Sequence, residues 1–374
     1  MTKSKVYFTN LRTRYGHNRL QKLRQLLAAA GLGEMTFEGK YTAIKMHLGE
    51  PGNLGYLRPN YAKVVADFVK ENKGKVFLTD CNTLYPGRRK NALDHLEAAY
   101  ENGFSPFSVG CHIIIGDGLR GTDDGEVEVK GGVYVKKAKI GQAILAADNI
   151  ISLSHFKGHD VAGFGGAMKN LGMGCGSVRG KMDMHSEGKP KINPDKCRGC
   201  GFCIKDCGQD AIVMTEGKAH IEQALCAGCG RCIGACPFSA VRAAWDVSNI
   251  RMNQKVAEYA KAVVQDRGAF HINLMIDIAP GCDCMSFNDL SILPDVGFFA
   301  SYDPVALDMA CVDMARTLPA LPNSYLTDRL EEMNAEAGEK DPFHICHPDS
   351  DWLSGLLHGE AIGLGSREYE LITV

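Results

Sequence analysis

The 374-residue sequence predicts an α/β protein, a mainly parallel sheet with flanking helices, into which a small cysteine-rich module is inserted. Three observations lead to this class. Over the first 180 residues, short apolar runs alternate with amphipathic helical patterns, which is typical of parallel sheets. Between positions 197 and 236, eight cysteines interrupt that alternation. After the cysteines the α/β pattern resumes, so we expect both flanking segments to build one sheet.

The expected strands of the first part are short apolar runs, and the expected helices repeat apolar residues at three- and four-residue steps. In the first helix Leu20, Leu23 and Leu27 share one face, and Gly31 ends it. Strands are predicted at Val6–Thr9, Thr42–Leu48, Val76–Thr79, His112–Gly116 and Ile150–Ser154. Helices are predicted near Asn18–Ala30, Asn60–Asn72, Arg89–Asn102 and Ile140–Ala147.

The pattern breaks at Arg179, where the polar stretch to Lys196 contains Gly and Pro and is typical of a linker. Beyond the cysteines, a helical stripe includes Met252 and Val263, and strands are predicted at His271–Ile278 and Val296–Ala300. Asp303 followed by Pro304 is a typical helix start.

We therefore expect residues 1–185 and 246–374 to form one split α/β domain around a module at 186–245. Three consecutive domains are the alternative. The split is preferred because the last part has only about two clear strands, too few for a sheet of its own.

Composition excludes several function classes. The formal charge of -2 gives no basic excess, so nucleic acid is not expected as a partner. No apolar run reaches the length of a membrane-spanning helix, and Val6–Phe8 is too short for a signal-peptide core. A cytoplasmic location without membrane attachment is expected. In such a chain, 15 cysteines favour metal binding over a disulfide framework.

The cysteine-rich module contains two runs with ferredoxin-type spacing. The second run lies 29 residues after the first, and Ile192 and Ile212 also match Ile221 and Val241, so the module is an internal repeat. In bacterial two-cluster ferredoxins, which the module resembles, the fourth cysteine of each run binds the other cluster. One [4Fe–4S] cluster is therefore assigned to Cys197, Cys200, Cys203 and Cys236, and the other to Cys226, Cys229, Cys232 and Cys207.

One residue departs from that family pattern, because Cys207 is followed by Gly208 where proline is usual. This changes the turn but removes no ligand. Two structural zinc sites are the alternative, since zinc also favours four thiolates. Duplicated runs of three close cysteines plus one are typical of clusters, whose function here would be to move single electrons.

Polar residues follow several of the predicted strands, at the edge where open parallel sheets form their sites. His155, Lys157 and His159 could supply metal ligands, a proton donor and a cation for an anionic substrate. An ordinary exposed loop is the alternative. The glycine-rich stretch 163–176 could bind an anion through its backbone amides, with Lys169 adding charge. Close backbone packing explains its glycines equally well.

Cys282 and Cys284 form the third polar segment, with Asp277 upstream. These thiols could chelate a further metal or form a redox pair. They could also be two unrelated cysteines near the end of a strand, since free cysteine often behaves as a small hydrophobe.

The same segments resemble the iron–sulfur proteins of the family "Domain of Unknown Function 362". The similarity lies in Phe156–His159, in Lys169–Cys175, in Asp277–Cys284 and in the run from Pro294 to Asp308, in this order with the module between them. The resemblance implies 4Fe–4S binding and the split α/β architecture, and it names no substrate.

The predicted function is that of an iron–sulfur electron-transfer protein whose two [4Fe–4S] clusters feed a site in the α/β domain. As an enzyme it would be an oxidoreductase, a reductase supplied with low-potential electrons under anaerobic conditions. The site would use His155, Lys157, His159, Lys169 and Asp277, with Cys282 and Cys284 as possible metal ligands and a small molecule or metal as an additional occupant. Either a redox partner protein or a small-molecule substrate is expected.

Two other functions remain open. The protein could be a non-enzymatic electron-transfer adaptor, or a metal-handling or sensor protein that uses Cys282 and Cys284. No G-x-G-x-x-G strand–helix motif and no radical-SAM cysteine run is present, which argues against a nicotinamide or flavin site of that type and against radical-SAM chemistry.

Overall fold

An eight-stranded sheet with the order β16-β1-β15-β14-β7-β2-β3-β4 organises the chain. Five neighbouring pairs are parallel, and only the two pairs made by β15 are antiparallel. The predicted mainly parallel α/β class is therefore confirmed. The computed structural model describes residues 3–84, 87–185, 189–226, 228, 230–244, 247–334 and 341–374. The strands are β1 (Ser4–Asn10), β2 (Tyr41–Lys45), β3 (Lys75–Asp80), β4 (His112–Ile115), β7 (Asn149–His155), β14 (Gly268–Met275), β15 (Gly297–Ser301) and β16 (Tyr369–Thr373).

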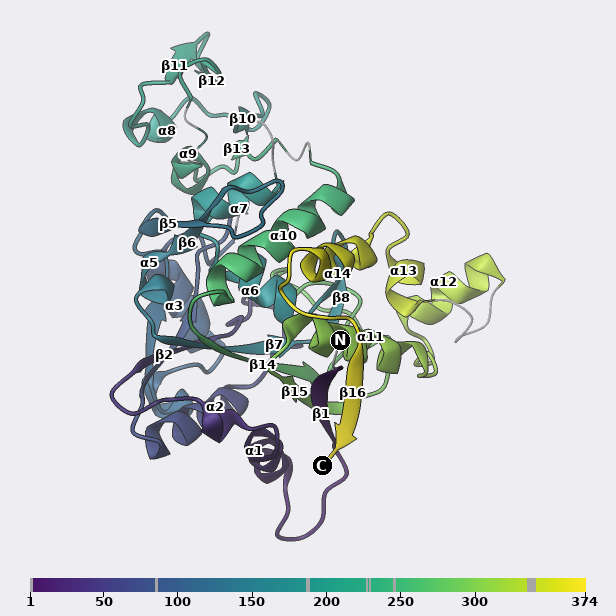
Figure 1. The fold of residues 1–374 in the computed structure, drawn as a ribbon. Coiled ribbons are helices and arrows are strands. Elements are labelled where there is room, and N and C mark those ends of the chain that lie inside the picture. Colours follow the sequence, from purple (N-terminus) through teal and green to yellow (C-terminus); the bar gives the residue numbers. More distant parts are fainter. Residues whose placement is uncertain are drawn as a thin grey trace.

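Helices cover both faces of this sheet (Figure 1). In β7, Ile151 and Leu153 pack with α1 and α2, whereas Ile150 packs on the opposite side with α6 and α10. Burial on both faces explains why the strands read as apolar runs rather than as alternating patterns. The helices are α1 (Arg19–Ala29), η1 (Leu32–Glu34), α2 (Pro59–Glu71), α3 (Ala92–Glu101), α4 (Pro106–Val109), α5 (Gln142–Leu145), α6 (Ala167–Cys175), α7 (Val178–His185), α10 (Asn249–Val264), α11 (Pro304–Arg316), α12 (Tyr325–Met333), α13 (Pro342–Cys346) and α14 (Trp352–Ala361).

The sheet combines strands from both sides of the cysteine-rich segment. Strands β1 to β7 precede that segment, while β14, β15 and β16 follow it and lie between or beside the earlier strands. Two small hairpins complete the α/β part, β5 (Asp124–Glu128) with β6 (Lys137–Gly141) and β8 (Lys157–His159) with β9 (Gly163–Gly165).

The cysteine-rich segment lies at one end of the molecule and adds no described strand to the main sheet (Figure 1). Its elements are β10 (Lys191–Ile192), α8 (Phe202–Lys205), β11 (Ile212–Thr215), β12 (Lys218–Ile221), α9 (Arg231–Ala235) and β13 (Val241–Arg242). Ile192 pairs with Val241, and Ile212 pairs with Ile221. In the 29-residue repeat, Ile192 corresponds to Ile221 and Val241 corresponds to Ile212, so the two pairs are equivalent. Such equivalence is expected when an approximate two-fold axis relates the repeats.

Several local predictions were wrong. Residues 179–185 of the expected linker belong to α7, because Met182 and Met184 are buried apolar contacts. The glycine-rich stretch forms β9 and α6 instead of a loop. Helix α3 begins at Ala92, after its N-cap Asn91, whereas Arg89 is held in a buried ion pair, and Ile140 belongs to β6, which precedes the short α5. Helices α12 to α14 and β16 were not predicted.

The start of α11 is as predicted. The carboxylate of Asp303 accepts hydrogen bonds from the backbone of Val305 and Ala306, and Pro304 occupies the first turn. No helix in the described part of the chain combines the length and the apolar character needed to cross a bilayer.

Candidate redox site

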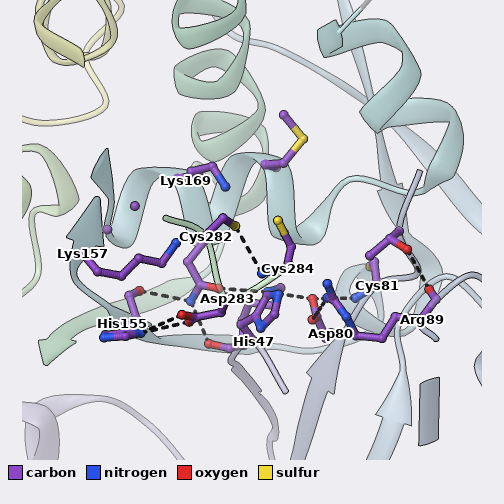
Figure 2. A pocket seen from close by; sticks show the side chains of 18 of the residues that line it. His47, Asp80, Cys81, Arg89, His155, Lys157, Lys169, Cys282, Asp283 and Cys284 are labelled. Carbon is purple, nitrogen blue, oxygen red and sulfur yellow. Dashed lines mark hydrogen bonds and ion pairs between the residues drawn. The ribbon is translucent and has the colours of Figure 1, made fainter. Parts of the chain in front are cut away.

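A cavity of about 100 Å³ lies where β2, β3 and β7 end, under the segment that follows β14 (Figure 2). Parallel strands place their carboxyl ends at one edge, so residues far apart in sequence meet there. Of the predicted site residues, His155, Lys157, Lys169, Cys282 and Cys284 line this cavity. The cavity is also lined by Lys45, His47, Asp80, Arg89 and Lys181, and by Asp283 between the two cysteines.

The charge of this lining favours an anion. Five cationic side chains face only two carboxylates, those of Asp80 and Asp283. In a site shielded from water, such an excess attracts a negatively charged ligand much more strongly than it would on the surface. The cations are Lys45, Arg89, Lys157, Lys169 and Lys181.

Cys282 is buried among hydrogen-bond donors. The backbone N–H of Cys284 lies 3.4 Å from its Sγ, and the side chains of Cys284, Lys157 and His159 also hydrogen-bond to it. The hydrogen bond from the Cys284 side chain, followed by the charges of Lys157 and Lys169, lowers the pKa of Cys282 well below its usual value although burial opposes this. These contacts favour the thiolate form of Cys282, which is the nucleophilic form of cysteine.

Cys284 is the thiol member of the pair. Its hydrogen bond to Cys282, together with burial, raises its pKa well above the usual value. The two neighbouring cysteines thus hold one proton between them, one as thiolate and one as donor. Burial acts to lower the pKa of Lys157, but the nearby Cys282 and Asp283 outweigh it and raise this pKa above its usual value.

Backbone N–H groups of the following turn hold His159 in one tautomer. Its Nδ1 accepts hydrogen bonds from the backbone N–H groups of Val161 and Ala162 at 3.1 and 3.0 Å. The proton is therefore on Nε2, and the ring is hydrogen-bonded to Cys282. Burial, followed by the charge of Lys169, lowers the pKa of His159, which keeps the ring neutral.

His155 is committed to an ion pair and is not free to bind a metal. Its Nδ1 lies 2.9 Å from Asp283 Oδ2, and its Nε2 lies 2.7 Å from the carbonyl oxygen of Ile276. Both ring nitrogens face acceptors, so the ring is an imidazolium; burial opposes the charge, but Asp283 raises the pKa of His155. This pair fixes the loop that carries Cys282 and Cys284 to the end of β7.

Asp277 does not join the group that the sequence predicted. Its side chain is about one third exposed, forms a 3.6 Å ion pair with Arg58 and does not line the cavity. Asp277 has a positive φ of 48°, so the chain turns sharply here and carries the following segment back to the cavity.

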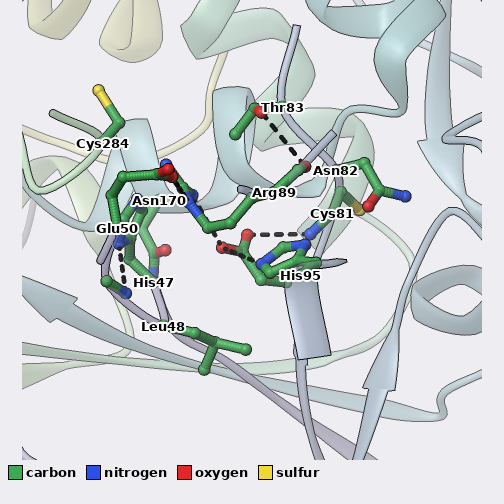
Figure 3. A network of polar contacts seen from close by, with 12 residues as sticks. His47, Leu48, Glu50, Cys81, Asn82, Thr83, Arg89, His95, Asn170 and Cys284 are labelled. Carbon is green, nitrogen blue, oxygen red and sulfur yellow. Dashed lines mark hydrogen bonds and ion pairs between the residues drawn. The ribbon is translucent and has the colours of Figure 1, made fainter. Parts of the chain in front are cut away.

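A second polar group, beneath the cavity, was missed by the sequence analysis (Figure 3). Asp80 Oδ1 lies 2.9 Å from Lys45 Nζ, and its Oδ2 lies 3.8 Å from Arg89 Nη1. Arg89 Nε donates to Glu50 at 2.7 Å. All four side chains are buried. A lysine inside the otherwise apolar run 42–46 was the one available signal, because an unpaired charge is not tolerated there.

His47 supplies a free donor to the cavity. Its Nδ1 accepts the backbone N–H of Gly49 at 3.0 Å, so the proton is on Nε2, which has no partner among the described residues. Burial, followed by the charge of Arg89, lowers the pKa of His47 to about 3 and keeps it neutral. A buried N–H that lines an otherwise cationic cavity is suited to hydrogen-bond an anionic ligand.

The glycine-rich stretch positions Lys169 by close packing rather than by cradling an anion. The amides at the start of α6 are already occupied, since Asp308 accepts from Ala167 N at 2.7 Å and from Met168 N at 2.9 Å. Gly172 packs against α10 so tightly that an added side-chain carbon would lie 2.1 Å from the carbonyl oxygen of Val256. Both contacts fix the helix that presents Lys169 to the cavity.

In the cysteine-rich segment, four of the predicted ligands surround a small internal space. They are Cys197, Cys200, Cys203 and Cys236, the set assigned to one cluster. No three His, Cys, Asp or Glu side chains within the described ranges lie close enough to hold a single metal ion.

The sulfurs of this segment also accept backbone hydrogen bonds at equivalent positions. Ala211 N lies 3.4 Å from Cys207 Sγ, and Ala240 N lies 3.3 Å from Cys236 Sγ, one repeat apart. Gly201 and Gly230 have matching φ values of 76° and 74° before α8 and α9. Cys226 and Cys232 are described, whereas Cys229 lies outside the described residues. The internal repeat of the sequence is therefore also present in the backbone of this segment.

The cysteine-rich segment packs directly on residues next to the cavity. A side-chain carbon added at Gly230 would lie 3.4 Å from Val178 and 3.9 Å from Leu84. Lys90 Nζ donates to the carbonyl oxygen of Cys236 at 3.0 Å. Leu84 and Lys90 are sequence neighbours of Thr83 and Arg89, which line the cavity. The second cysteine run thus lies nearer the cavity than Cys200, which is exposed.

A family model described as "Domain of unknown function (DUF362)" matches residues 42–313. The match extends over more than half of the chain, which therefore belongs to this family. A protein from Thermotoga maritima is similar in structure at 10% identity and a TM-score of 0.35, covering 68% of this chain and 49% of that one. The lactate racemase apoprotein from Thermoanaerobacterium thermosaccharolyticum is similar at 13% identity and a TM-score of 0.40, covering 99% and 83%. No curated protein matches the chain.

Proposed function

We propose that this DUF362 protein is an iron–sulfur oxidoreductase, in which two [4Fe–4S] clusters relay electrons to the cavity around Cys282 and Cys284. The clusters would be held by the cysteines of the two runs and would supply one-electron transfer. The substrate would be a small anionic molecule. We place the reaction in the cytoplasm, with a redox partner protein as electron source and without nucleic acid or membrane as partner.

The observation that carries this proposal is the contact between the cysteine-rich segment and the rim of the cavity. Lys90 bonds to the Cys236 backbone, and Arg89 lines the cavity and forms the buried pair with Glu50. A protein that only carried electrons between partners would have no need for a cationic cavity directly behind its cluster module.

The residues of the cavity would have different roles in binding the substrate and in supplying protons. Lys157 and Lys169 would bind the negative charge of the substrate, and the N–H of His47 would orient it. Cys282 and Cys284 would share one proton, because their hydrogen bond lowers the pKa of Cys282 and raises that of Cys284. His155 and Asp283 would keep the loop in place rather than touch the substrate.

The experiment is anion binding to anaerobically reconstituted protein, read by electron paramagnetic resonance (EPR) of the reduced clusters and by calorimetry. Small carboxylates are expected to bind the wild type and to change the cluster spectrum, while Lys169→Gln binds them at least about tenfold more weakly. Lys63→Gln, which changes a surface lysine paired with Asp67, is the matched control.

The adaptor alternative makes a different prediction. If the α/β part only docks a partner, alanine at His159 and Cys284 leaves electron transfer from reduced clusters to any acceptor unchanged. Absence of anion binding together with unchanged electron transfer in these variants would refute the oxidoreductase proposal.

A further inference from the structure

Cys282 lies between two cavities. It lines the inner cationic cavity and also a second cavity of about 220 Å³ on the outer side. Most of the surface of the outer cavity is apolar and includes Met285, Phe287 and Tyr325, while Asp160 and Asp289 also line it, so that the cations available to an anionic group lie in the inner cavity. Phe287 is 65% exposed. Cys282 is therefore reachable from outside although it is itself buried.

Cys284 faces the opposite way. It lines the inner cavity and not the outer one. It lies near Arg89, whose charge acts to lower the pKa of Cys284 (Figures 2 and 3). Lys90, which follows Arg89 in the sequence, donates to the carbonyl oxygen of Cys236. The two sulfurs thus divide the site, with Cys284 on the side of the cysteine-rich segment and Cys282 on the side of the outer cavity.

We infer that Cys282 and Cys284 form a dithiol–disulfide couple that reduces a small organic disulfide bearing an anionic group. This inference rests on the proposed relay function and names its substrate class. The apolar wall of the outer cavity would receive the organic part of the substrate. Lys157 and Lys169 would attract its charge toward Cys282.

The reaction balances in three steps. Cys282 thiolate attacks one sulfur of the substrate R–S–S–R′, so that a Cys282–S–S–R bond forms and R′–S⁻ leaves. Cys284 gives its proton to R′–S⁻ and attacks the sulfur of Cys282, forming the Cys282–Cys284 disulfide and releasing R–S⁻, which takes a proton from solvent. Two electrons, delivered singly by the clusters, and one proton restore the thiolate and the thiol. The sum is one disulfide, two electrons and two protons consumed for two thiols.

The geometry of the pair suits these roles. Cys282 lines the outer cavity, where substrate would arrive, and Cys284 lines only the inner cavity, behind it, where a resolving group would be needed. A disulfide between residues two apart is strained. Strain makes the bond easier to reduce, so it would favour return of the couple to the dithiol.

The test uses the cluster-loaded protein under anaerobic conditions and dithiodibenzoate, an aromatic disulfide with two carboxylates, as the probe. Cys284→Ser is expected to retain one mercaptobenzoate on Cys282 as a mixed disulfide, seen as a mass increase of the chain, because the resolving thiol is missing. Cys282→Ser retains none. Cys346→Ser, which changes a buried cysteine of a different core region, behaves as the wild type.

A second measurement does not depend on variants. Wild-type protein with pre-reduced clusters should reoxidise by two electrons per disulfide added, and mass spectrometry should locate a transient Cys282–Cys284 bond. No adduct in folded Cys284→Ser, or equal reoxidation in Cys282→Ser and wild type, would overturn the inference. Carboxylate binding that still changes the cluster spectrum in that case would leave the relay function standing, so the two failures are distinguishable.

A separate surface supports a second inference about the electron source. A groove of about 510 Å³ runs along the seam between the cysteine-rich segment and the α/β part. Its basic residues are Lys90, Arg120, Lys205 and Arg231, against the single acid Asp206. Three large apolar side chains of the groove are more than half exposed, namely Leu93, Leu119 and Phe202.

We propose that a small acidic one-electron carrier protein docks in this groove. Apolar contacts ringed by cations are complementary to an acidic partner. The helices α8 and α9 form one wall of the groove and carry Cys203 and Cys232. A carrier bound there would lie beside the ligands of both clusters.

The probe is a reduced plant-type ferredoxin, an acidic [2Fe–2S] protein, mixed with oxidised cluster-loaded protein in a stopped-flow instrument. The double substitution Lys205→Glu with Arg231→Glu should slow cluster reduction at least about tenfold at low salt, and high salt should remove most of the difference. Lys136→Glu, an exposed lysine elsewhere, should leave the rate near that of the wild type. Equal rates for all three proteins at low salt would overturn the docking proposal.

Discussion

Replacing Asp80 with asparagine should be among the most destabilising isosteric changes in the α/β part. Asp80 Oδ1 contacts Lys45 Nζ at 2.9 Å, and the side chains are 4% and 1% exposed. Burial acts to raise the pKa of Asp80, but the charge of Lys45, supported by that of Arg89, outweighs burial and lowers this pKa far below its usual value. The carboxylate is therefore charged in the folded protein at any ordinary pH.

The expected loss follows from what the substitution leaves behind. Removing one member of a buried ion pair costs about 3–5 kcal/mol, because the remaining charge stays buried. Lys45 keeps Asn170 at 2.9 Å and Arg89 keeps Glu50, so the cost should fall at the lower end, about 3 kcal/mol. With a urea dependence of about 3 kcal/mol per molar, the unfolding midpoint would move down by about 1 M.

The assay is anaerobic urea unfolding followed by circular dichroism, with Asp67→Asn as the control. Asp67 pairs with Lys63 at 2.9 Å, the same distance, but on the surface, where such pairs contribute about 0.3–0.5 kcal/mol. Because the folded pKa of Asp80 is lowered, its contribution is present above about pH 4 and disappears as pH falls. A midpoint shift no larger than that of the control would refute the reasoning.

Three further predictions concern the site and its supports. Asp283→Asn should lower the urea midpoint most between about pH 4 and 6.5, because the pKa of Asp283 is lowered to about 2 and that of His155 is raised; the loss should shrink above and below this window, and a flat profile would contradict it. Gly172→Ala should cost about 1–3 kcal/mol in thermal unfolding, since the new carbon would meet the Val256 carbonyl at 2.1 Å, whereas Gly33→Ala, with 3.8 Å of room, should be neutral. Chelating the iron should make residues 189–244 sensitive to protease while the main sheet persists, because the core there is small and four of its buried residues are cysteines that would hold the clusters; uniform protection would argue against metal-dependent folding.

Much of the fold could be predicted because burial on both sheet faces leaves apolar runs in the sequence, as at Ile150–Ser154. The start of α11 was also readable, since Asp303 and Pro304 act locally. The boundary errors have a common cause. Helix α3 begins at Ala92 rather than at Arg89, because Arg89 forms an ion pair with Glu50. Helix α7 forms because Met182 shares a core with residues such as Ile233. Both interactions join residues that are far apart in the sequence.

The candidate site also contains some residues that could be predicted from the sequence and others that could not. Predicted residues at strand ends, such as His155 and Lys157, meet in the cavity because parallel strands all end at one edge. Asp277 does not line the cavity, because its turn directs the side chain to Arg58. Sequence position alone also could not separate the roles of Cys282 and Cys284. Only Asp283 separates them, yet Cys282 lines both cavities and Cys284 lines only the inner one, and that difference supports a direction for the proposed reaction, with substrate on the outer side and clusters on the inner side.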